Sequence, residues 1–220
     1  MLFRSGEVAA VEAYDPKETD FSIGIKKVVG LFYPRPELDM EEEELEEYEI
    51  IELESEDEPE PIIDFDAIFI PDSFERVALI APQLAYHDVV GVRLLGTNLW
   101  NSPKLMEIAG EYVRGAVFPA GFFSRGGYEG TKKFVELYNS YFGHEPGFLA
   151  ALGYDTVRLV KEIVRKGNAD IKTREDLHYV LTTTNDFNGL HGAMFFDQNR
   201  VAKRDAILLT ILGRHFFPVP

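Results

Sequence analysis

The stretch that decides the fold runs from Phe65 to Phe123 and reads FDAIFIPDSFERVALIAPQLAYHDVVGVRLLGTNLWNSPKLMEIAGEYVRGAVFPAGFF. It contains three short apolar runs, at Asp66–Ile70, Val92–Leu95 and Ala116–Phe118, with a helical pattern between each run and the next. Apolar runs that alternate with amphipathic helices predict strand–helix–strand units in a parallel sheet, joined by right-handed crossovers. We therefore expect an α/β fold.

Polar and aromatic residues follow the first two of these runs. In a sheet of this kind, ligands lie beyond the carboxyl ends of the strands. The residues at that position, which we predict to bind a ligand, are Asp72, Ser73 and Phe74 after the first run and Thr97, Asn98 and Trp100 after the second. Each has a structural alternative, because Asp and Ser also cap helices and Trp100 could instead staple the following helix.

Composition and charge narrow the class of protein. The 220 residues are 45% hydrophobic, contain no cysteine and include no apolar run of the roughly 18 residues that a membrane helix needs. The net charge of -16 is concentrated at residues 37–60, which hold 15 acidic residues and no basic one. We interpret residues 37–60 as a solvated acidic insertion, and we expect no nucleic-acid partner because no basic face emerges.

Elements on either side of the central stretch complete the expected fold. Residues 7–14 (EVAAVEAY) predict a first strand, and a helix follows from Phe21 to Val29 and ends at Gly30. Asn101 or Ser102, followed by Pro103, predicts a helix start, with Gly110 at the far end. The closing residues 206–212 and 215–219 predict a hairpin, whose first strand is apolar throughout as in a central strand.

Residues after Pro119 have a different character. Helical patterns run over 129–142, 147–166 and 173–183, and the last one opens with Thr173 and Asp176 in a capping-box arrangement. The one strand candidate nearby is 192–196, so these helices are expected to lack a sheet of their own.

Catalytic, cofactor and metal motifs are not found. The five histidines form no i, i+4 pair, and RGGYEGTKK at 125–133 has glycines one residue too close for a phosphate-binding loop. There is no nucleophile elbow and no kinase signature. The sequence therefore predicts no enzyme activity, no cofactor and no metal site.

The order of several segments resembles a known family. EAYDPKETDFS, FDAIFIPDSFERVALIAPQL, LLGTNLWNSPKLMEIAGEYVRGAVF, FVELYNSYFGHEPGFLAALGYDTVRLV and DFNGLHGAMFFDQNR together are similar to the second half of type I periplasmic solute-binding proteins of the leucine/isoleucine/valine receptor family. The similarity looks greatest to the penicillin-binding-protein activator branch, the LpoA-like proteins. It covers nearly all of the chain except the acidic insertion.

This resemblance implies two Rossmann-like lobes that close on a ligand. Residues 1–118 plus 200–220 would form the second lobe, and 119–199 would be the helical part of an incomplete first lobe. The family implies a hinge at Gly121, Phe122 and Phe123. It also implies a carboxylate in the segment GTNLW that receives a ligand's ammonium group, and Asn98 stands there instead.

Two functions follow from the resemblance as expectations. The first is a periplasmic receptor of the ABC-transporter type that binds a small polar ligand, such as an amino acid or a peptide fragment, and meets an ABC permease. The alternative is an interaction module that docks on a cell-wall (peptidoglycan) synthase. Exposed apolar faces on the helices of 119–199 would also favour a homodimer.

Overall fold

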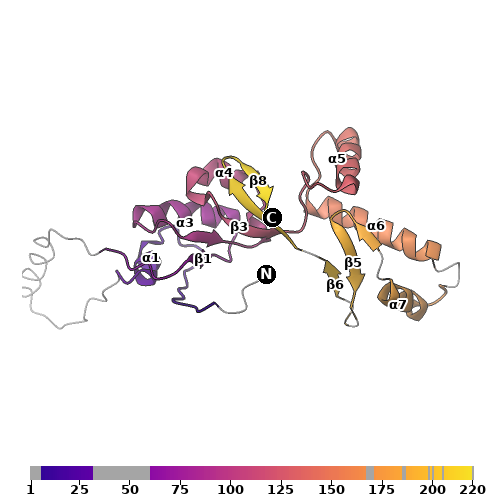
Figure 1. Cartoon of the computed structure of the whole chain (residues 1–220), viewed down its shortest axis with the longest axis horizontal. Helices are drawn as coiled ribbons and strands as arrows, with labels where there is room; N and C mark the ends of the chain where they lie inside the picture. Colours follow the sequence, from indigo (N-terminus) through magenta and orange to yellow (C-terminus); the bar gives the residue numbers. More distant parts are fainter. Residues whose placement is uncertain are drawn as a thin grey trace, which may run out of the picture. The chain divides into compact units, whose positions relative to one another are not determined.

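A computed structural model describes residues 6–31, 60–166, 171–184, 187–197, 199, 201–204 and 206–219. The acidic insertion predicted at 37–60 lies outside these residues, apart from Glu60. The chain divides into two compact units, Met1–Ala116 with Ile211–His215 and Val117–Thr210 with Phe216–Pro220 (Figure 1). The assignment of residues to two lobes of a receptor stays a prediction.

The first unit contains the predicted parallel strands. β1 (Ala67–Phe69) and β2 (Arg93–Leu95) pair in parallel, with Ala67 opposite Arg93 and Phe69 opposite Leu95. Each strand is the centre of a predicted apolar run, so this part of the fold is confirmed.

Three helices of the first unit pack together. α3 (Phe74–Tyr86) connects β1 to β2 and packs on α1 (Ser22–Val28) and on α4 (Pro103–Ala109). Its buried side chains recur at helical spacing and are Val77, Ala78, Ile80, Ala81 and Leu84. α4 begins after Ser102 with Pro103 in its first turn, as predicted, because the fixed φ of proline suits the start of a helix. Two 3₁₀ turns, η1 (Asn98–Trp100) and η2 (Gly110–Val113), flank α4.

The strand predicted at residues 7–14 is wrong. These residues have no regular secondary structure, and Val8 and Val11 are 74% and 80% exposed. An apolar segment is held in a sheet where one of its faces is buried, and residues 7–13 are all exposed. Tyr14 alone of this segment is partly buried.

The main sheet is mixed rather than wholly parallel. Its five strands have the order β1-β2-β3-β7-β8, with β3 at Val117–Ala120, β7 at Ile207–Leu212 and β8 at His215–Pro218. β3 and β7 are antiparallel, with Val117 opposite Thr210 and Ala120 opposite Ile207. The apolar strand β7 thus lies between β3 and β8, as its composition predicts.

The second unit has a small sheet that the sequence did not predict. Its helices α5 (Glu129–Phe142), α6 (Phe148–Lys166) and α7 (Arg174–Thr183) match the predicted ranges. An antiparallel sheet of β4 (Phe187–Gly189), β5 (Gly192–Phe196) and β6 (Ala202–Arg204) packs against α6 and α7 (Figure 1). The expectation that these helices lack a sheet is therefore wrong. β4 and β6 have three residues each, too few to show an alternating pattern.

Two apolar clusters form the core of the second unit. One joins Phe122 after β3 to Phe134 on α5, Ala151 on α6 and Leu190 in the β4–β5 turn. The other brings Leu159 and Ile163 of α6 onto Phe187 of β4, with partly buried residues of α7 and β5 around them. The helices are thus held by packing on the small sheet.

Candidate ligand-binding edge

The loops after β1 and β2 lie together at one edge of the sheet. Because the two strands are parallel, their carboxyl ends meet there, and the backbone N–H of Ile70 donates to the carbonyl of Leu95 at 2.9 Å. The indole Nε1 of Trp100 donates to the backbone carbonyl of Asp72 at 3.1 Å. The residues predicted from the two loops are therefore brought together.

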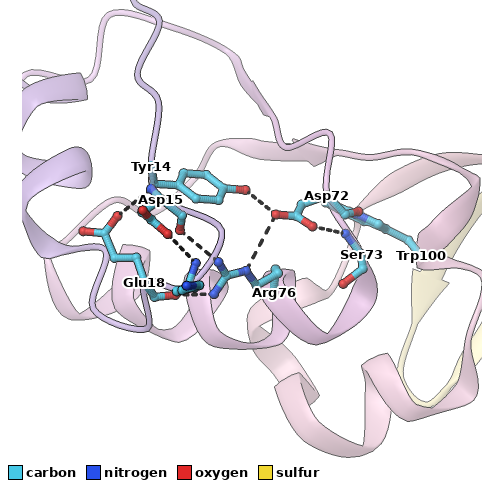
Figure 2. A network of polar contacts seen from close by, with 8 residues as sticks. Tyr14, Asp15, Glu18, Asp72, Ser73, Arg76 and Trp100 are labelled. Atoms are coloured by element: carbon cyan, nitrogen blue, oxygen red, sulfur yellow. Dashed lines mark hydrogen bonds and ion pairs between the residues drawn. The ribbon is translucent and has the colours of Figure 1, made fainter.

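The carboxylate of Asp72 is engaged by this chain's own donors (Figure 2). Its Oδ2 accepts a hydrogen bond of 2.8 Å from the hydroxyl of Tyr14, and its Oδ1 accepts one of 2.6 Å from the backbone N–H of Ser73. The Nε of Arg76, one turn along α3, lies 3.9 Å from Oδ2. Both carboxylate oxygens thus have partners within the fold.

Arg76 holds residues 14–21, which we call the N-terminal strap, against the start of α3 (Figure 2). Its guanidinium donates to the backbone carbonyls of Glu18 and Asp15, the latter at 3.0 Å. It also lies over two rings of the strap, 5.9 Å from the centroid of Tyr14 and 5.5 Å from that of Phe21. A guanidinium offers five N–H donors and a flat surface, so one side chain can donate to both carbonyls and also lie over the rings.

Tyr14 is strongly affected by this environment. Burial, followed by the hydrogen bond to Asp72 and the negative charge of that carboxylate, raises the pKa of Tyr14 from 10.0 to about 12, although the charge of Arg76 acts in the opposite direction. The phenol therefore stays protonated and keeps donating to Asp72 throughout the neutral range.

Ser73 and Phe74 begin α3. Ser73 is the N-cap with extended backbone, yet its hydroxyl makes no capping hydrogen bond to the helix. Capping of this turn comes instead from Asp72, whose Oδ1 takes the Ser73 N–H. The Ser73 and Phe74 side chains are partly exposed.

Thr97 and Asn98 form the start of η1. The Oγ1 of Thr97 accepts a hydrogen bond of 3.3 Å from the backbone N–H of Leu99, so this hydroxyl caps the turn. Asn98, the first residue of η1, is exposed. Its neutral amide thus lies at the edge where the predicted ligand would lie.

Trp100 is completely buried, with 0% of its surface exposed. Its ring packs on the backbone of Gly96, where a Cβ atom would come within 2.1 Å of the indole. This close approach explains why residue 96 has no side chain. Trp100 sits as a core residue beneath the edge, and a role in walling a ligand pocket stays a prediction.

The predicted hinge residues lie in the second unit, just after β3. Phe122 and Phe123 are buried, and Phe122 meets the ring of Phe134 edge-on with centroids 6.0 Å apart. A Cβ at Gly121 would come within 2.4 Å of the Phe148 ring. This segment is therefore well packed, and the hinge stays a prediction.

His191 fastens this segment to the β4–β5 turn. Its Nε2 lies 3.2 Å from the backbone N and 3.0 Å from the backbone O of Phe123, and its ring meets that of Phe122 edge-on. Burial lowers the pKa of His191 below 6.5, and the charge of Arg204 adds to this, while the Phe123 backbone and the charge of Asp155 oppose it. A neutral ring accepts the Phe123 N–H at Nε2, and protonation of that nitrogen removes this acceptor.

The described parts of the chain show an open groove, but no metal site and no membrane-spanning helix. No group of three His, Cys, Asp or Glu residues there is placed to hold a metal ion. No helix there is both long and apolar enough to cross a bilayer. An open groove on the last turns of α3 contains none of the predicted ligand residues and is lined by Pro82, Gln83, Ala85, Tyr86 and Tyr112.

The sequence-based prediction missed Tyr14, Arg76 and His191. Tyr14 lies 58 residues from Asp72 and His191 lies 68 from Phe123, so no local motif joins them. The signal that could have found Arg76 is its place one helical turn after Asp72, where i, i+4 charges are neighbours.

Comparison with solved structures shows the same fold. The leucine-binding protein LivK of Thermotoga maritima matches with a TM-score of 0.63 and 23% identity, covering 94% of this chain and 49% of that one. A putative branched-chain amino acid ABC transporter protein of Rhodospirillum rubrum gives 0.65 and 23%, covering 84% and 49%. LivJ of Streptococcus pneumoniae, solved with isoleucine, gives 0.59 and 21%, covering 94% and 50%.

The chain spans about half the length of these solved structures. No curated protein matches it. The model of a family described as periplasmic binding protein matches residues 64–214, which include β1, β2 and the candidate edge. That match covers more than half of the sequence, and the chain therefore belongs to the periplasmic binding protein family.

Proposed function

We propose that this chain forms one wall of an extracytoplasmic solute receptor of the ABC-transporter type, and that the receptor closes two lobes on a small polar ligand such as an amino acid. The edge formed by Ser73, Phe74, Thr97 and Asn98 would contact the ligand, with Asp72 and Trp100 fixing the two loops. Closure would bend the chain at Gly121, Phe122 and Phe123.

The observation that carries this proposal is the junction of the two loops after parallel strands. The 3.1 Å hydrogen bond from Trp100 to the Asp72 carbonyl holds them at the place where ligands bind in α/β sheets. The family match adds that related proteins bind solutes, and two solved relatives contain leucine or isoleucine.

Thermal unfolding of the full-length protein with a panel of amino acids and peptide fragments tests this proposal. A ligand at about 100 times its dissociation constant stabilises the folded state by roughly 2.7 kcal/mol, which for a chain of this size raises the midpoint by about 5–10 °C. The double variant Ser73→Ala/Asn98→Ala should abolish the rise.

Ser140→Ala, an exposed hydroxyl on α5, is the matched control and should keep the full rise. Equal rises in the double variant and the wild type would show that the ligand binds elsewhere. No rise with any ligand would contradict the proposed function.

An interaction module on a peptidoglycan synthase, as in the penicillin-binding-protein activator branch, is the second candidate. A group of exposed apolar residues on one side of a helix is typical of a protein contact. α6 has such a group, which favours this function: Leu149, Val157, Val160 and Val164. Binding of a purified synthase domain, together with no thermal response to any solute, would favour this function over the first.

Both functions place the protein in the periplasm, where a receptor would also meet its ABC permease. Fractionation of cells that express the full-length protein tests this location. Recovery in the cytoplasmic fraction alone would contradict both functions.

A further inference from the structure

We infer that the edge formed by the loops after β1 and β2 recognises an uncharged hydroxyl or amide group of its ligand and does not accept an ammonium group. This inference rests on the proposed function and names the ligand class for that same site. The charged groups at the edge decide this, because a group that already has partners within the fold is less available to a ligand.

Asp72, the one carboxylate among the predicted ligand residues, is already committed. Tyr14 and the Ser73 N–H donate to its two oxygens, and Arg76 adds a positive charge 3.9 Å away. An ammonium ligand would have to compete with the Tyr14 and Ser73 donors for the carboxylate oxygens and would approach a guanidinium of the same sign. Both effects make the exchange unfavourable.

Arg76 is itself held, so the network is not easily rearranged. Its guanidinium donates to two backbone carbonyls of the N-terminal strap and stacks near two of its rings. Its side chain is only 15% exposed. Freeing Asp72 would therefore require the strap to detach from α3.

Glu75, the next acidic residue, faces solvent in the first turn of α3. Val77 faces the core of the unit, and a helix turns about 100° per residue, so Glu75 lies roughly 200° away from Val77 on α3. That direction is the solvent side of the helix, and Glu75 is exposed there. It does not replace Asp72.

The polar groups that remain at the edge are neutral. They are the hydroxyls of Ser73 and Thr97 and the amide of Asn98, of which Ser73 makes no capping bond and Asn98 is exposed. A hydroxyl and an amide can each donate and accept, so they match a ligand hydroxyl or amide. They lack the negative charge that makes a hydrogen bond to an ammonium group about twice as strong.

Calorimetric titration of the full-length protein with matched acid pairs tests this inference. Each pair shares one carbon skeleton and exchanges an α-ammonium for an α-hydroxyl: alanine with lactate, leucine with 2-hydroxy-4-methylpentanoate, and phenylalanine with phenyllactate. For the skeleton that binds, we expect the hydroxy acid to bind at least about tenfold more tightly than the amino acid.

Asn98→Asp should reverse the preference, because it places an exposed carboxylate at the edge. The amino acid should gain about tenfold or more, while the hydroxy acid should lose affinity. Asn139→Asp on α5 makes the same charge change at another exposed asparagine and should leave the wild-type preference as it is.

Tighter binding of the amino acid by the wild type would overturn this inference and leave the proposed function standing. An unchanged preference in Asn98→Asp would also overturn it, because Asn98 would then not face the ligand. No binding of any pair by the wild type and by Asn98→Asp would overturn this inference, and together with no thermal response to any solute it would overturn the proposed function as well.

Discussion

At the scale of single residues, Tyr14 links residues 6–13, which have no regular secondary structure, to the candidate edge. It lies just beyond a stretch without regular structure, yet its hydroxyl and its ring both have partners, in Asp72 and in Phe21 at 5.1 Å. Tyr14 stabilises the fold through its hydrogen bond to Asp72, and only the protonated phenol can donate that bond.

We predict that Tyr14 makes the folded protein sensitive to alkaline pH. Its pKa of about 12 in the fold lies above the unfolded value near 10, so the folded state holds the proton more tightly. The corresponding stability is fully present below pH 10 and is lost as the pH rises from about 10 to about 12. Urea titrations at pH 8 to 12 should show this fall in the free energy of unfolding.

Tyr14→Phe should flatten that fall and lower the stability at pH 8 by about 1 kcal/mol, the contribution of one partly buried hydrogen bond. Tyr86→Phe, which removes an exposed hydroxyl at the end of α3, is the matched control and should cost nothing at pH 8. An alkaline fall of equal size in Tyr14→Phe and the wild type would contradict the role of Tyr14.

At the scale of elements, α7 shows how a local signal supports packing. The Oγ1 of Thr173 accepts the Asp176 N–H at 3.1 Å, and Asp176 Oδ2 accepts the Thr173 N–H at 2.8 Å, which completes the predicted capping box. Hydrogen bonds from the Lys172 backbone first, and then from Thr173, hold the pKa of Asp176 below 3.8. The capped helix then packs Val180 and Leu181 on the second core cluster.

We predict that Thr173→Ala lowers the free energy of unfolding by about 1 kcal/mol, because an N-cap hydroxyl is lost. Thr173→Ser keeps the hydroxyl and should lose only a few tenths of that amount. Urea unfolding at pH 7 measures both. Equal losses in the two variants would mean that the methyl group of Thr173, and not its cap, supports α7.

At the scale of the whole molecule, α6 has apolar residues on two sides. Ala151, Leu159 and Ile163 are buried in the second unit, while a neighbouring side of the helix exposes four apolar residues by 50% to 79%: Leu149, Val157, Val160 and Val164. A helix that is apolar on both sides is normally covered on both. Under the first proposed function, in which no synthase occupies the exposed side, we propose that a second copy of the chain covers it.

We therefore predict a concentration-dependent dimer in sedimentation velocity. Leu149→Lys/Val160→Lys should shift the protein to monomer, because two charges would be buried without partners. Asn139→Lys/Ser140→Lys adds the same charge to polar positions of α5 and should leave the dimer intact. A monomer at every concentration for the wild type would contradict this prediction.

The sequence by itself determined the alternation of strands and helices from Phe65 to Phe123, and it marked the loops after β1 and β2. These features rest on hydrophobic periodicity and on caps, which act between residues a few positions apart. It also indicated the apolar strand β7, whose composition reflects neighbours on both sides.

Only the tertiary structure decided that Asp72 is committed to Tyr14 and Arg76, that residues 7–14 form no strand, and that β4, β5 and β6 make a sheet. The physical reason is that these features depend on partners far along the chain. The sequence around Asp72 does not show whether its carboxylate faces a ligand or a tyrosine that lies 58 residues away. Its availability for binding is set by which donors the fold brings to it.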